Sequence, residues 1–445
     1  MQLRNRKREI PSSSKLPVWA EVVVIVEKGP IGQHPAVSET DFYFERFGFC
    51  ERQIEAKPHP DLALSVVIPC HNEPDLVGAL DSLAACIRPK CATEIIVVIN
   101  SAATAADSVK EQNRRSYKSA VDWIREPGFQ VHLILAENLP RKHAGVGLAR
   151  KIGMDEATRR LDDVGNLAPG IIACFDADCT CAPNYLTALE THFDKHTKSP
   201  ACSIRFEHPL TGDLDPRIYE AITAYELHLR YFIGACRFAE HPHAFHTIGS
   251  SMAVRAEIYI AQGGMNRRKA GEDFYFLQKI IPLGNFTELN STRVIPSPRV
   301  SDRVPFGTGK AVGDALESDE ISQTYPLEPF FELKEFFTNI DRDNLISDSP
   351  HIPPVLTPFL EQTNFSSAIQ EIAAQTSSAS AFRGRFFRWF DAFRLLKFVH
   401  FARDRHFGSR EVCKTANELL QILAPTAVSS DPTELLNIYR QIQHI

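Results

Sequence analysis

Short apolar runs alternate with helix-like segments through the first part of the chain. The runs cover residues 64–69, 94–99, 131–135 and 171–175. After the first run, apolar residues return at helical spacing, as at Leu76, Leu80 and Leu83. Strands that alternate with helices predict an α/β fold, with a doubly wound, mostly parallel sheet flanked by helices.

Polar side chains follow several of these runs at the point where each predicted strand ends. In open sheets of this kind, ligands bind outside the carboxyl ends of the strands. We therefore expect these side chains to share one edge. They are His71, Asn72 and Glu73 after the first run, Asn100 at the end of the second, and Asp176 and Asp178 after the fourth.

Asp176 and Asp178 are separated by a single residue at the end of a buried strand. Mg²⁺ and Mn²⁺ prefer oxygen ligands and commonly bind through one or two carboxylates together with substrate phosphates. An isolated Asp-x-Asp also fits a solvated turn, so the other motifs must decide between the two interpretations.

Four motifs together resemble glycosyltransferase family 2 with a GT-A fold. They are Val-Ile-Pro-Cys-His-Asn-Glu at 67–73, Lys-His-Ala-Gly-Val-Gly-Leu-Ala-Arg at 142–150 with Gly153, Asp-Ala-Asp at 176–178, and Gly-Gly-Met-Asn at 263–266 followed by Gly-Glu-Asp at 271–273. Their order and spacing fit over about residues 62–310. This predicts an N-terminal extension at 1–60, a GT-A domain at 61–310, and a linker with a helical C-terminal region at 311–445.

The resemblance implies a metal-dependent enzyme that moves a sugar from a nucleotide diphosphate to an acceptor hydroxyl, with inversion. A retaining enzyme with a similar strand and Asp-x-Asp is the alternative. Asp178, with Asp176, matches the metal position, so the expected cofactor is Mn²⁺ or Mg²⁺. Asp273 matches the general base, beside Glu272. The Gln-x-x-Arg-Trp motif of processive synthases is absent, which favours a non-processive enzyme. The expected nucleotide-binding residues in the matched region are Pro69, His71, Asn72, Glu73, Asn100, Lys142, Gly147, Arg150 and Asp176.

One departure concerns the nucleotide base. The family usually has an Asp soon after the second strand, whereas this chain has Asn100 and Ser101 there. Either residue substitutes for the Asp, or base recognition differs.

The polar loop Ser301–Lys310 suits closure over a diphosphate, with Arg303 or Lys310 as a charge clamp and Asp302 as a late metal ligand. An ordinary surface loop is the alternative. Glu272 and Asp273 also fit a structural role as acids at a helix N-terminus.

Two other functions were weighed. A sugar nucleotidyltransferase needs a glycine-rich, basic loop after the first strand, which residues 69–73 do not supply. A non-catalytic GT-A-like scaffold is disfavoured because Asp178 and Asp273 are both present.

Composition limits the function classes. The chain has 445 residues, a formal charge of −6 and 44% hydrophobic residues, which argues against general binding to nucleic acid. No apolar run reaches the ~18 residues of a membrane span, and the basic start lacks the apolar core of a signal peptide. Ten cysteines in so long a chain do not indicate a disulfide framework, so a cytoplasmic location is expected. The oligomeric state stays open.

Histidine and cysteine groups outside the motifs are interpreted as structural. His241, His243 and His246 lack partner carboxylates, which favours packing or an acceptor cleft over a metal site. The cysteines at 174, 179 and 181 lack a paired Cys-x-x-Cys pattern, and buried thiols behave as small hydrophobes.

The flanking segments are expected to be packing elements. Residues 22–26 and Phe42–Phe44 are predicted to add a strand or to cover a sheet edge. Residues 311–350 are predicted as a linker with a helix at 330–337, and 216–238 as an amphipathic helix. The basic, aromatic segment Ala381–Arg410 is predicted as a helix that packs on the catalytic domain, with peripheral contact to an anionic membrane as the alternative.

Overall fold

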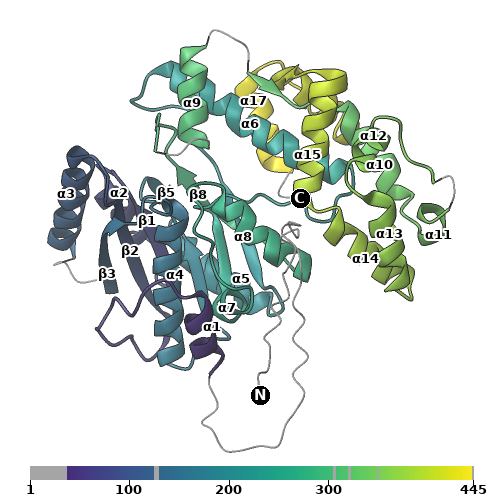
Figure 1. The fold of residues 1–445 in the computed structure, drawn as a ribbon. Helices are drawn as coiled ribbons and strands as arrows, with labels where there is room; N and C mark the ends of the chain where they lie inside the picture. Colours follow the sequence, from purple (N-terminus) through teal and green to yellow (C-terminus); the bar gives the residue numbers. More distant parts are fainter. Residues whose placement is uncertain (1–37, 125–129, 304–306, 319–321, 348–349, 443–445) are drawn as a thin grey trace, which may run out of the picture. The chain divides into compact units, whose positions relative to one another are not determined.

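The computed structural model describes residues 38–124, 130–303, 307–318, 322–347 and 350–442 (Figure 1). An eight-stranded sheet has the order β3-β2-β1-β4-β7-β6-β8-β5. Its strands are β1 (Leu62–Cys70), β2 (Ala92–Ala102), β3 (Gln130–Leu139), β4 (Ile171–Cys174), β5 (Cys179–Cys181), β6 (Ala201–Phe206), β7 (Met252–Arg255) and β8 (Thr287–Pro296).

Strand directions place several loops at one edge of the sheet. β1 is parallel to β2 and β4, β2 to β3, and β6 to β8, whereas β4–β7, β6–β7 and β5–β8 are antiparallel. Two antiparallel steps restore the original direction, so β6 and β8 run the same way as β1 and β4. The carboxyl ends of β1, β2, β4, β6 and β8 therefore share an edge, and the predicted mostly parallel sheet flanked by helices is confirmed.

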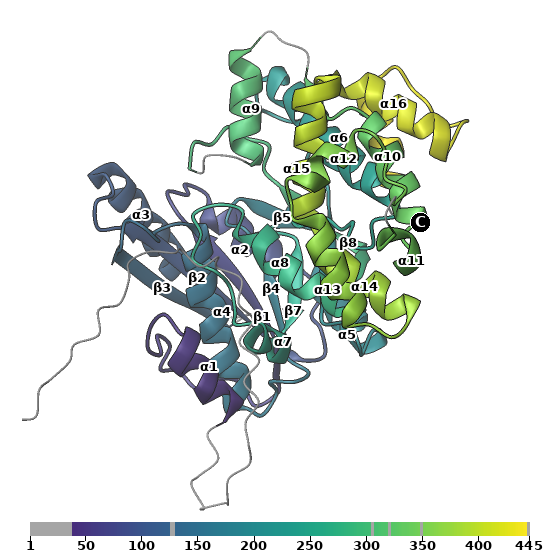
Figure 2. The same cartoon turned by 45° about the vertical axis from the view of Figure 1, so that its right-hand side comes forward.

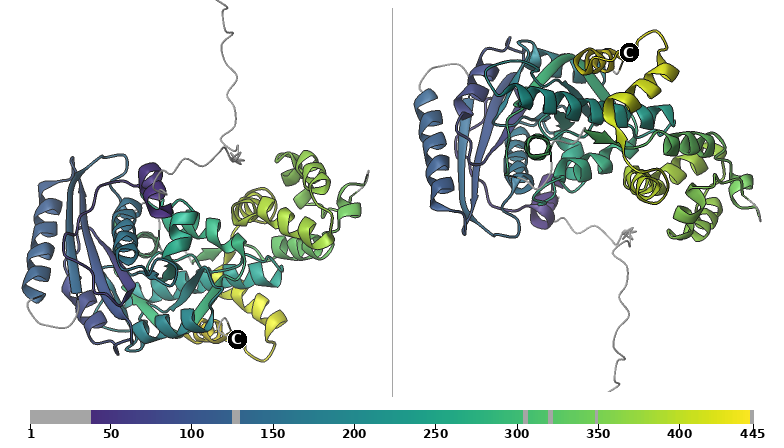
Figure 3. Two further views of the ribbon diagram at one scale, coloured as in Figure 1. Left: turned by 90° about the horizontal axis from the view of Figure 1, so that it is seen from below. Right: turned by 90° about the horizontal axis from the view of Figure 1, so that it is seen from above.

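Helices cover both faces of the sheet because both faces are apolar (Figure 3). Val67, Ile96 and Val98 point to one face, where α4 and α8 pack, and Val66, Ile95 and Val97 point to the other, where α2 and α5 pack. The helices of this part are α1 (Glu39–Phe47), α2 (Leu76–Ala84), α3 (Asp107–Trp123), α4 (Val146–Asp163), α5 (Tyr185–Lys195), α6 (Pro216–Phe238), α7 (Ala256–Ala261) and α8 (Glu272–Ile280), with a 3₁₀ turn at Ile281–Leu283.

A third apolar core joins α6 to the C-terminal helices. Leu227 and Tyr231 of α6 are buried with Phe330, Phe336 and Leu419. The predicted helices at 216–238 and 330–337 are confirmed as α6 and α10. The later elements are α9 (Thr308–Glu317), β9 (Gln323–Thr324), α10 (Glu328–Thr338), α11 (Arg342–Leu345), α12 (Leu356–Glu361), α13 (Phe365–Ala374), α14 (Ala379–Trp389), α15 (Ala392–Ala402), a π-helical turn (Arg403–Phe407), β10 (Arg410–Glu411), α16 (Val412–Leu423) and α17 (Pro432–Ile442).

The strand alternative for Phe42–Phe44 and the single helix predicted for Ala381–Arg410 are wrong. Phe42–Phe44 lies in the helix α1 and adds no strand. Ala381–Arg410 is not one helix, because α14 ends at Trp389 and Asp391 caps a new helix, its side chain accepting a hydrogen bond from the Arg394 backbone N–H. The other predicted stretch, residues 22–26, lies outside the described residues.

The aromatic rings of the segment 381–410 are largely buried in protein, as predicted. Phe386 and Phe390 are fully buried in the third core. Phe393 on α15 reaches the helices that cover the sheet, where its ring centroid lies 4.5 Å from that of Phe274 on α8. Figure 2 shows α15 next to α8. Among the described residues, none of the helices combines the length and apolar character that a membrane span requires.

Candidate active site

The loop after β1 is tied to the end of β2 by a side chain from α3. The backbone N–H of Asn72, which has a positive φ of 49°, donates to Asn113 Oδ1 over 2.8 Å. Asn113 Nδ2 in turn donates to the Asn100 carbonyl at 2.9 Å, and His71 Nδ1 lies 2.7 Å from the same oxygen. Asn tolerates the left-handed conformation better than most residues do. A single Asn within a helical pattern carries no sequence signal, so Asn113 was not predicted.

Two arginines hold the carboxylates at the centre of the edge. Glu73 is fully buried and accepts hydrogen bonds from Arg299 Nη1 at 2.9 Å and Arg303 Nη1 at 3.0 Å. Asp178 Oδ2 accepts from Arg303 Nη2 at 2.8 Å, and Arg299 Nη2 lies 3.4 Å from the same oxygen. The two negative charges of Glu73 and Asp178 are thus balanced by the positive charges of the two arginines. Arg299 was missed because it follows β8, whose place in the sheet the sequence does not reveal.

Arg150 links Asp176 of the Asp-x-Asp motif to Glu272 of α8. Its Nη2 donates to Asp176 Oδ1 over 2.6 Å, and its Nη1 pairs with Glu272. The side chains of Arg150 and Glu272 are almost fully buried, at 3% and 2% exposed. Burial raises the pKa of Asp176, and the Arg150 charge opposes that effect. Arg150 is therefore placed to orient two acidic groups rather than to face solvent.

Asp273 is the more available carboxylate of the Glu272–Asp273 pair. It is half-buried in the first turn of α8, where Oδ1 accepts from the Phe274 backbone N–H at 2.7 Å. Burial raises the pKa of Asp273, whereas Arg150 and the Phe274 N–H lower it. The helix start therefore stabilises the carboxylate structurally, as the alternative interpretation expected. A raised pKa also brings a carboxylate closer to the range useful for a general base.

Gly147 allows the loop before α8 to approach α4. A Cβ at this position would clash with the Arg268 carbonyl oxygen and lie 2.9 Å from Glu272 Cβ. A side chain here would push the segment that carries Glu272 and Asp273 away. Gly147 is thus a packing requirement of the site.

Two buried oxygens at the end of β2 have no hydrogen-bond partner in the described structure. They are Asn100 Oδ1 and Ser101 Oγ, on residues that are 2% and 0% exposed. Unpaired buried polar atoms are costly and rare. They mark the two positions at which the sequence departs from the family pattern for base recognition.

Asp176 and Asp178 fit a divalent cation that is shared with a ligand. Arginine contacts engage Asp176 Oδ1 and Asp178 Oδ2, so in the described part of the chain the second oxygen of each carboxylate has no arginine partner. Their side chains are 33% and 21% exposed. Among the described residues, no group of three or more His, Cys, Asp or Glu side chains is placed to hold a metal ion by itself. Two carboxylates completed by substrate phosphate oxygens are typical of Mg²⁺ sites.

Several predicted residues make no hydrogen bond or ion pair with this cluster in the described part of the chain. Lys142 is exposed, Pro69 is buried within β1, and Asp302 is exposed. Lys310 pairs with Asp314 on α9 rather than with a site carboxylate. Of the two proposed clamp residues, only Arg303 contacts the acidic centre.

The three histidines at 241–246 lie in buried or half-buried positions. His241 Nε2 lies 3.1 Å from the Phe390 carbonyl, and its ring packs edge-on against Phe387. Burial lowers the pKa of His241 to about 3 and that of His243 to about 4. These rings are therefore neutral at pH 7. His241 connects the loop after α6 to the end of α14 through Phe387 and Phe390.

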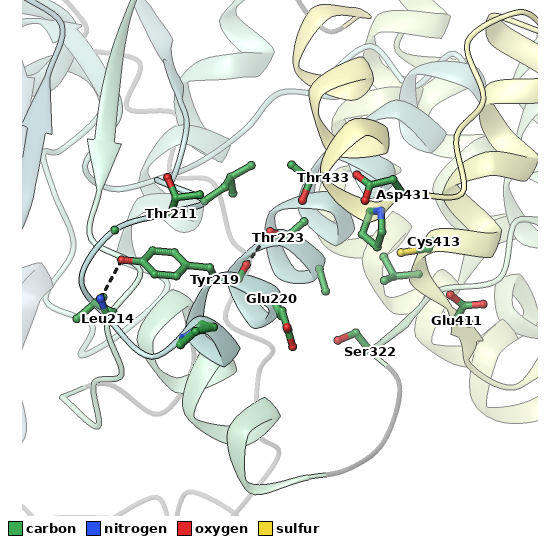
Figure 4. Close-up of a pocket in the computed structure, with 16 residues that line it drawn as sticks. Thr211, Leu214, Tyr219, Glu220, Thr223, Ser322, Glu411, Cys413, Asp431 and Thr433 are labelled. Atoms are coloured by element: carbon green, nitrogen blue, oxygen red, sulfur yellow. Dashed lines mark hydrogen bonds between the residues drawn. The ribbon is translucent and has the colours of Figure 1, made fainter.

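A cavity of about 760 Å³ lies at the start of α6 and is a different feature (Figure 4). Loop 210–216, α6 and the segments that begin α16 and α17 line it. The lining carries the carboxylates of Glu220, Glu411 and Asp431 and no Lys, Arg or His. Its negative charge disfavours a diphosphate, which leaves the arginine-bearing edge as the candidate site for phosphates.

A family model matches the part of the chain that carries the first three sequence motifs. Residues 65–262 match the model of the family described as Glycosyl transferase family 2. A crystal structure of S. aureus TarS 1-349 with UDP-GlcNAc has 13% identity and a TM-score of 0.37, covering 86% of this chain and 91% of that one. The same protein with UDP has 12% identity and a TM-score of 0.35, covering 86% and 90%. No curated protein matches the chain significantly.

Proposed function

We propose that the enzyme moves a sugar from a nucleotide diphosphate donor to an acceptor hydroxyl, because residues 65–262 match the model of Glycosyl transferase family 2. We further propose that transfer depends on Mn²⁺ or Mg²⁺, inverts the anomeric carbon and is non-processive. The observation that carries the proposal is the gathering of Glu73, Asp176, Asp178, Arg299 and Arg303 at the carboxyl edge of the sheet.

The donor would bind across the ends of β1, β2 and β4. The unpaired Asn100 Oδ1 would accept a hydrogen bond from the nucleotide base. The guanidinium groups of Arg303 and Arg299 would turn from the carboxylates to the diphosphate. A guanidinium group can donate two parallel hydrogen bonds to phosphate oxygens. Asp178 and Asp176 would hold a divalent cation, whose charge would offset the negative charge of the departing diphosphate.

Asp273 would act as the general base. An acceptor hydroxyl is a weak nucleophile at neutral pH, so its proton must leave as the bond to the sugar forms. Asp273 would take that proton on the face of the sugar opposite the diphosphate, which inverts the anomeric carbon. Glu272 is fully engaged with Arg150 and would serve to position α8. A placed base of this kind is worth about 10²–10⁴ in rate.

The two alternatives explain fewer of these contacts. A nucleotidyltransferase needs phosphate-binding glycines after β1, where the loop instead has Asn72 with a positive φ and a buried Glu73. A non-catalytic scaffold would not require Asp273 to be half-buried with a raised pKa. A cytoplasmic setting is proposed because all ten cysteines are free thiols.

The test is a panel of nucleotide diphosphate sugars with Mn²⁺, measured by thermal shift and calorimetry. A donor that binds the native state raises the melting temperature. Asp178→Asn should abolish the Mn²⁺-dependent part of donor binding. Asp273→Asn should leave donor affinity within about threefold and lower turnover by about 10² or more.

Lys118→Gln, at an exposed position of α3, is the matched control and should change neither quantity. If no nucleotide sugar binds, the proposed activity is wrong. If Asp273→Asn turns over at the wild-type rate, the base lies elsewhere.

A further inference from the structure

Two cysteines 95 positions apart meet beside the Asp-x-Asp motif. The Sγ atoms of Cys86, just after α2, and Cys181, at the end of β5, are 3.5 Å apart. Ser82 on α2 fixes this approach, since its Oγ accepts from the Cys181 backbone N–H at 2.9 Å. The Cys86 thiol is also 3.5 Å from the Ser82 carbonyl oxygen. Both cysteines therefore contact Ser82, and these contacts keep the two sulfurs close together.

Cys86 differs from every other cysteine in its electrostatic surroundings. A hydrogen bond from the Cys181 thiol lowers the pKa of Cys86, and the backbone N–H groups of Leu186 and Tyr185 add to this. Those N–H groups belong to the first turn of α5, where a helix favours negative charge. The pKa values of the other nine thiols are all raised: they are Cys50, Cys70, Cys91, Cys174, Cys179, Cys181, Cys202, Cys236 and Cys413.

The pair has the parts of a reversible thiol switch. Thiolates react with oxidants whereas thiols are comparatively inert, and reactive cysteines often lie at helix N-termini with a resolving thiol nearby. Cys86 is 5% exposed and Cys181 is half-buried, so a water-sized oxidant is the appropriate reagent. A disulfide needs an S–S distance of about 2.05 Å. The sulfurs must therefore approach by roughly 1.5 Å, which the position of β5 at the edge of the sheet permits.

We propose that Cys86 and Cys181 are a modification site at which a hydroperoxide forms a reversible disulfide. The Cys86 thiolate attacks the O–O bond of hydrogen peroxide, becomes a sulfenic acid and releases hydroxide. The Cys181 sulfur then attacks the Cys86 sulfur and displaces the hydroxyl, which leaves with a proton as water. In total, two thiols lose two electrons and two protons, and one peroxide becomes two waters. A dithiol reductant reverses the reaction.

The bond would join α2 to the strand that follows Asp178. Cys181 lies three positions after Asp178, and β5 pairs with β8, which leads to Arg299. The site is separate from the proposed transfer chemistry and does not depend on it.

The test is treatment of the reduced full-length protein with a small excess of hydrogen peroxide, followed by alkylation of free thiols and peptide mapping. The expected product is a Cys86–Cys181 peptide pair that has lost two hydrogen atoms and disappears after dithiothreitol. Cys50→Ser, which removes a distant half-buried thiol, should form the same pair.

Two variants separate the roles of the thiols. Cys181→Ser should leave the sulfenic acid on Cys86, seen as one added oxygen atom on its peptide, and Cys86→Ser should show no such addition on Cys181. The proposal is overturned if wild-type protein forms no Cys86–Cys181 pair, or if Cys86 proceeds directly to the sulfinic acid. Because the peptide map uses wild-type protein, this result stands even where a variant fails to fold.

Discussion

Arg303 donates a hydrogen bond to Asp178 over 2.8 Å, across 125 positions of the chain. The same guanidinium contacts the buried Glu73, so one side chain bridges the two carboxylates. Arg303 engages only Oδ2 of Asp178, so a divalent cation that bound the other oxygen, as proposed, would share this carboxylate with a positive side chain. The repulsion would ease if a diphosphate drew the guanidinium away.

Arg303→Gln should therefore change two affinities in opposite directions. Binding of Mn²⁺ alone should tighten by about threefold or more, because a competing charge is removed from Asp178. Binding of UDP or GDP should weaken by roughly tenfold, since a charge-assisted phosphate contact is lost. Calorimetry with each ligand separately measures both. Lys310→Gln is the control, because Lys310 pairs with Asp314. If both affinities fall together, Arg303 does not compete with the cation.

Arg150→Met should destabilise the protein strongly. The substitution leaves the buried carboxylate of Glu272 without its partner, and breaking a buried pair from one side costs about 3–5 kcal/mol. The double variant Arg150→Met with Glu272→Gln should recover part of this loss, because no uncompensated buried charge remains. Urea unfolding measures both. Arg52→Met removes the exposed Arg52–Asp163 pair and should cost less than about 1 kcal/mol. Equal losses in the two single variants would contradict the inferred burial.

Gly147→Ala should impair turnover and lower stability. The added methyl group meets the Arg268 carbonyl and Glu272 Cβ, and overpacking of this kind costs about 1–3 kcal/mol. The displaced helix start carries Asp273, so kcat should fall more than donor affinity. Steady-state kinetics and thermal melting give the two readouts. Gly384→Ala is the control, because no atom lies within 4 Å of its added Cβ, and in the helix α14 it should stabilise slightly.

His241 should make stability depend on pH. Burial lowers its folded-state pKa to about 3, below the ordinary value of 6.5. The unfolded chain then binds more protons between these values, so stability is complete above about pH 6.5 and falls as the pH decreases toward 3. At pH 5 this single group accounts for up to about 2 kcal/mol.

Unfolding of wild type and His241→Gln at pH 7.5 and pH 5 tests the assignment. The variant should be the less stable protein at pH 7.5, because it loses the packing on Phe387, and the gap should narrow at pH 5. A gap that widens on acidification would show that His241 is protonated in the folded protein.

The four strands β1 to β4 and the edge that carries Glu73, Asp176 and Asp178 were predictable from the chain. Each depends on local pattern: the apolar period separates strand from helix, and parallel strands connected by helices end on the same side. The secondary structure of segments without a regular apolar periodicity was predicted less well. Phe42–Phe44 reads as a strand by composition, yet it packs as a helix because Tyr43 contacts Tyr259 and Asp155.

Contacts between distant side chains were decided only by the tertiary structure. The pairing of Arg299 and Arg303 with Glu73 follows from the position of β8 beside β6, which no local pattern encodes. The linkage of Asp176 to Glu272 through Arg150 likewise depends on how closely α4 approaches α8. The sequence alone therefore determined which chemical groups stand at the ends of the strands. Strand order and packing decided which of those groups meet, because side-chain contacts depend on positions in space rather than along the chain.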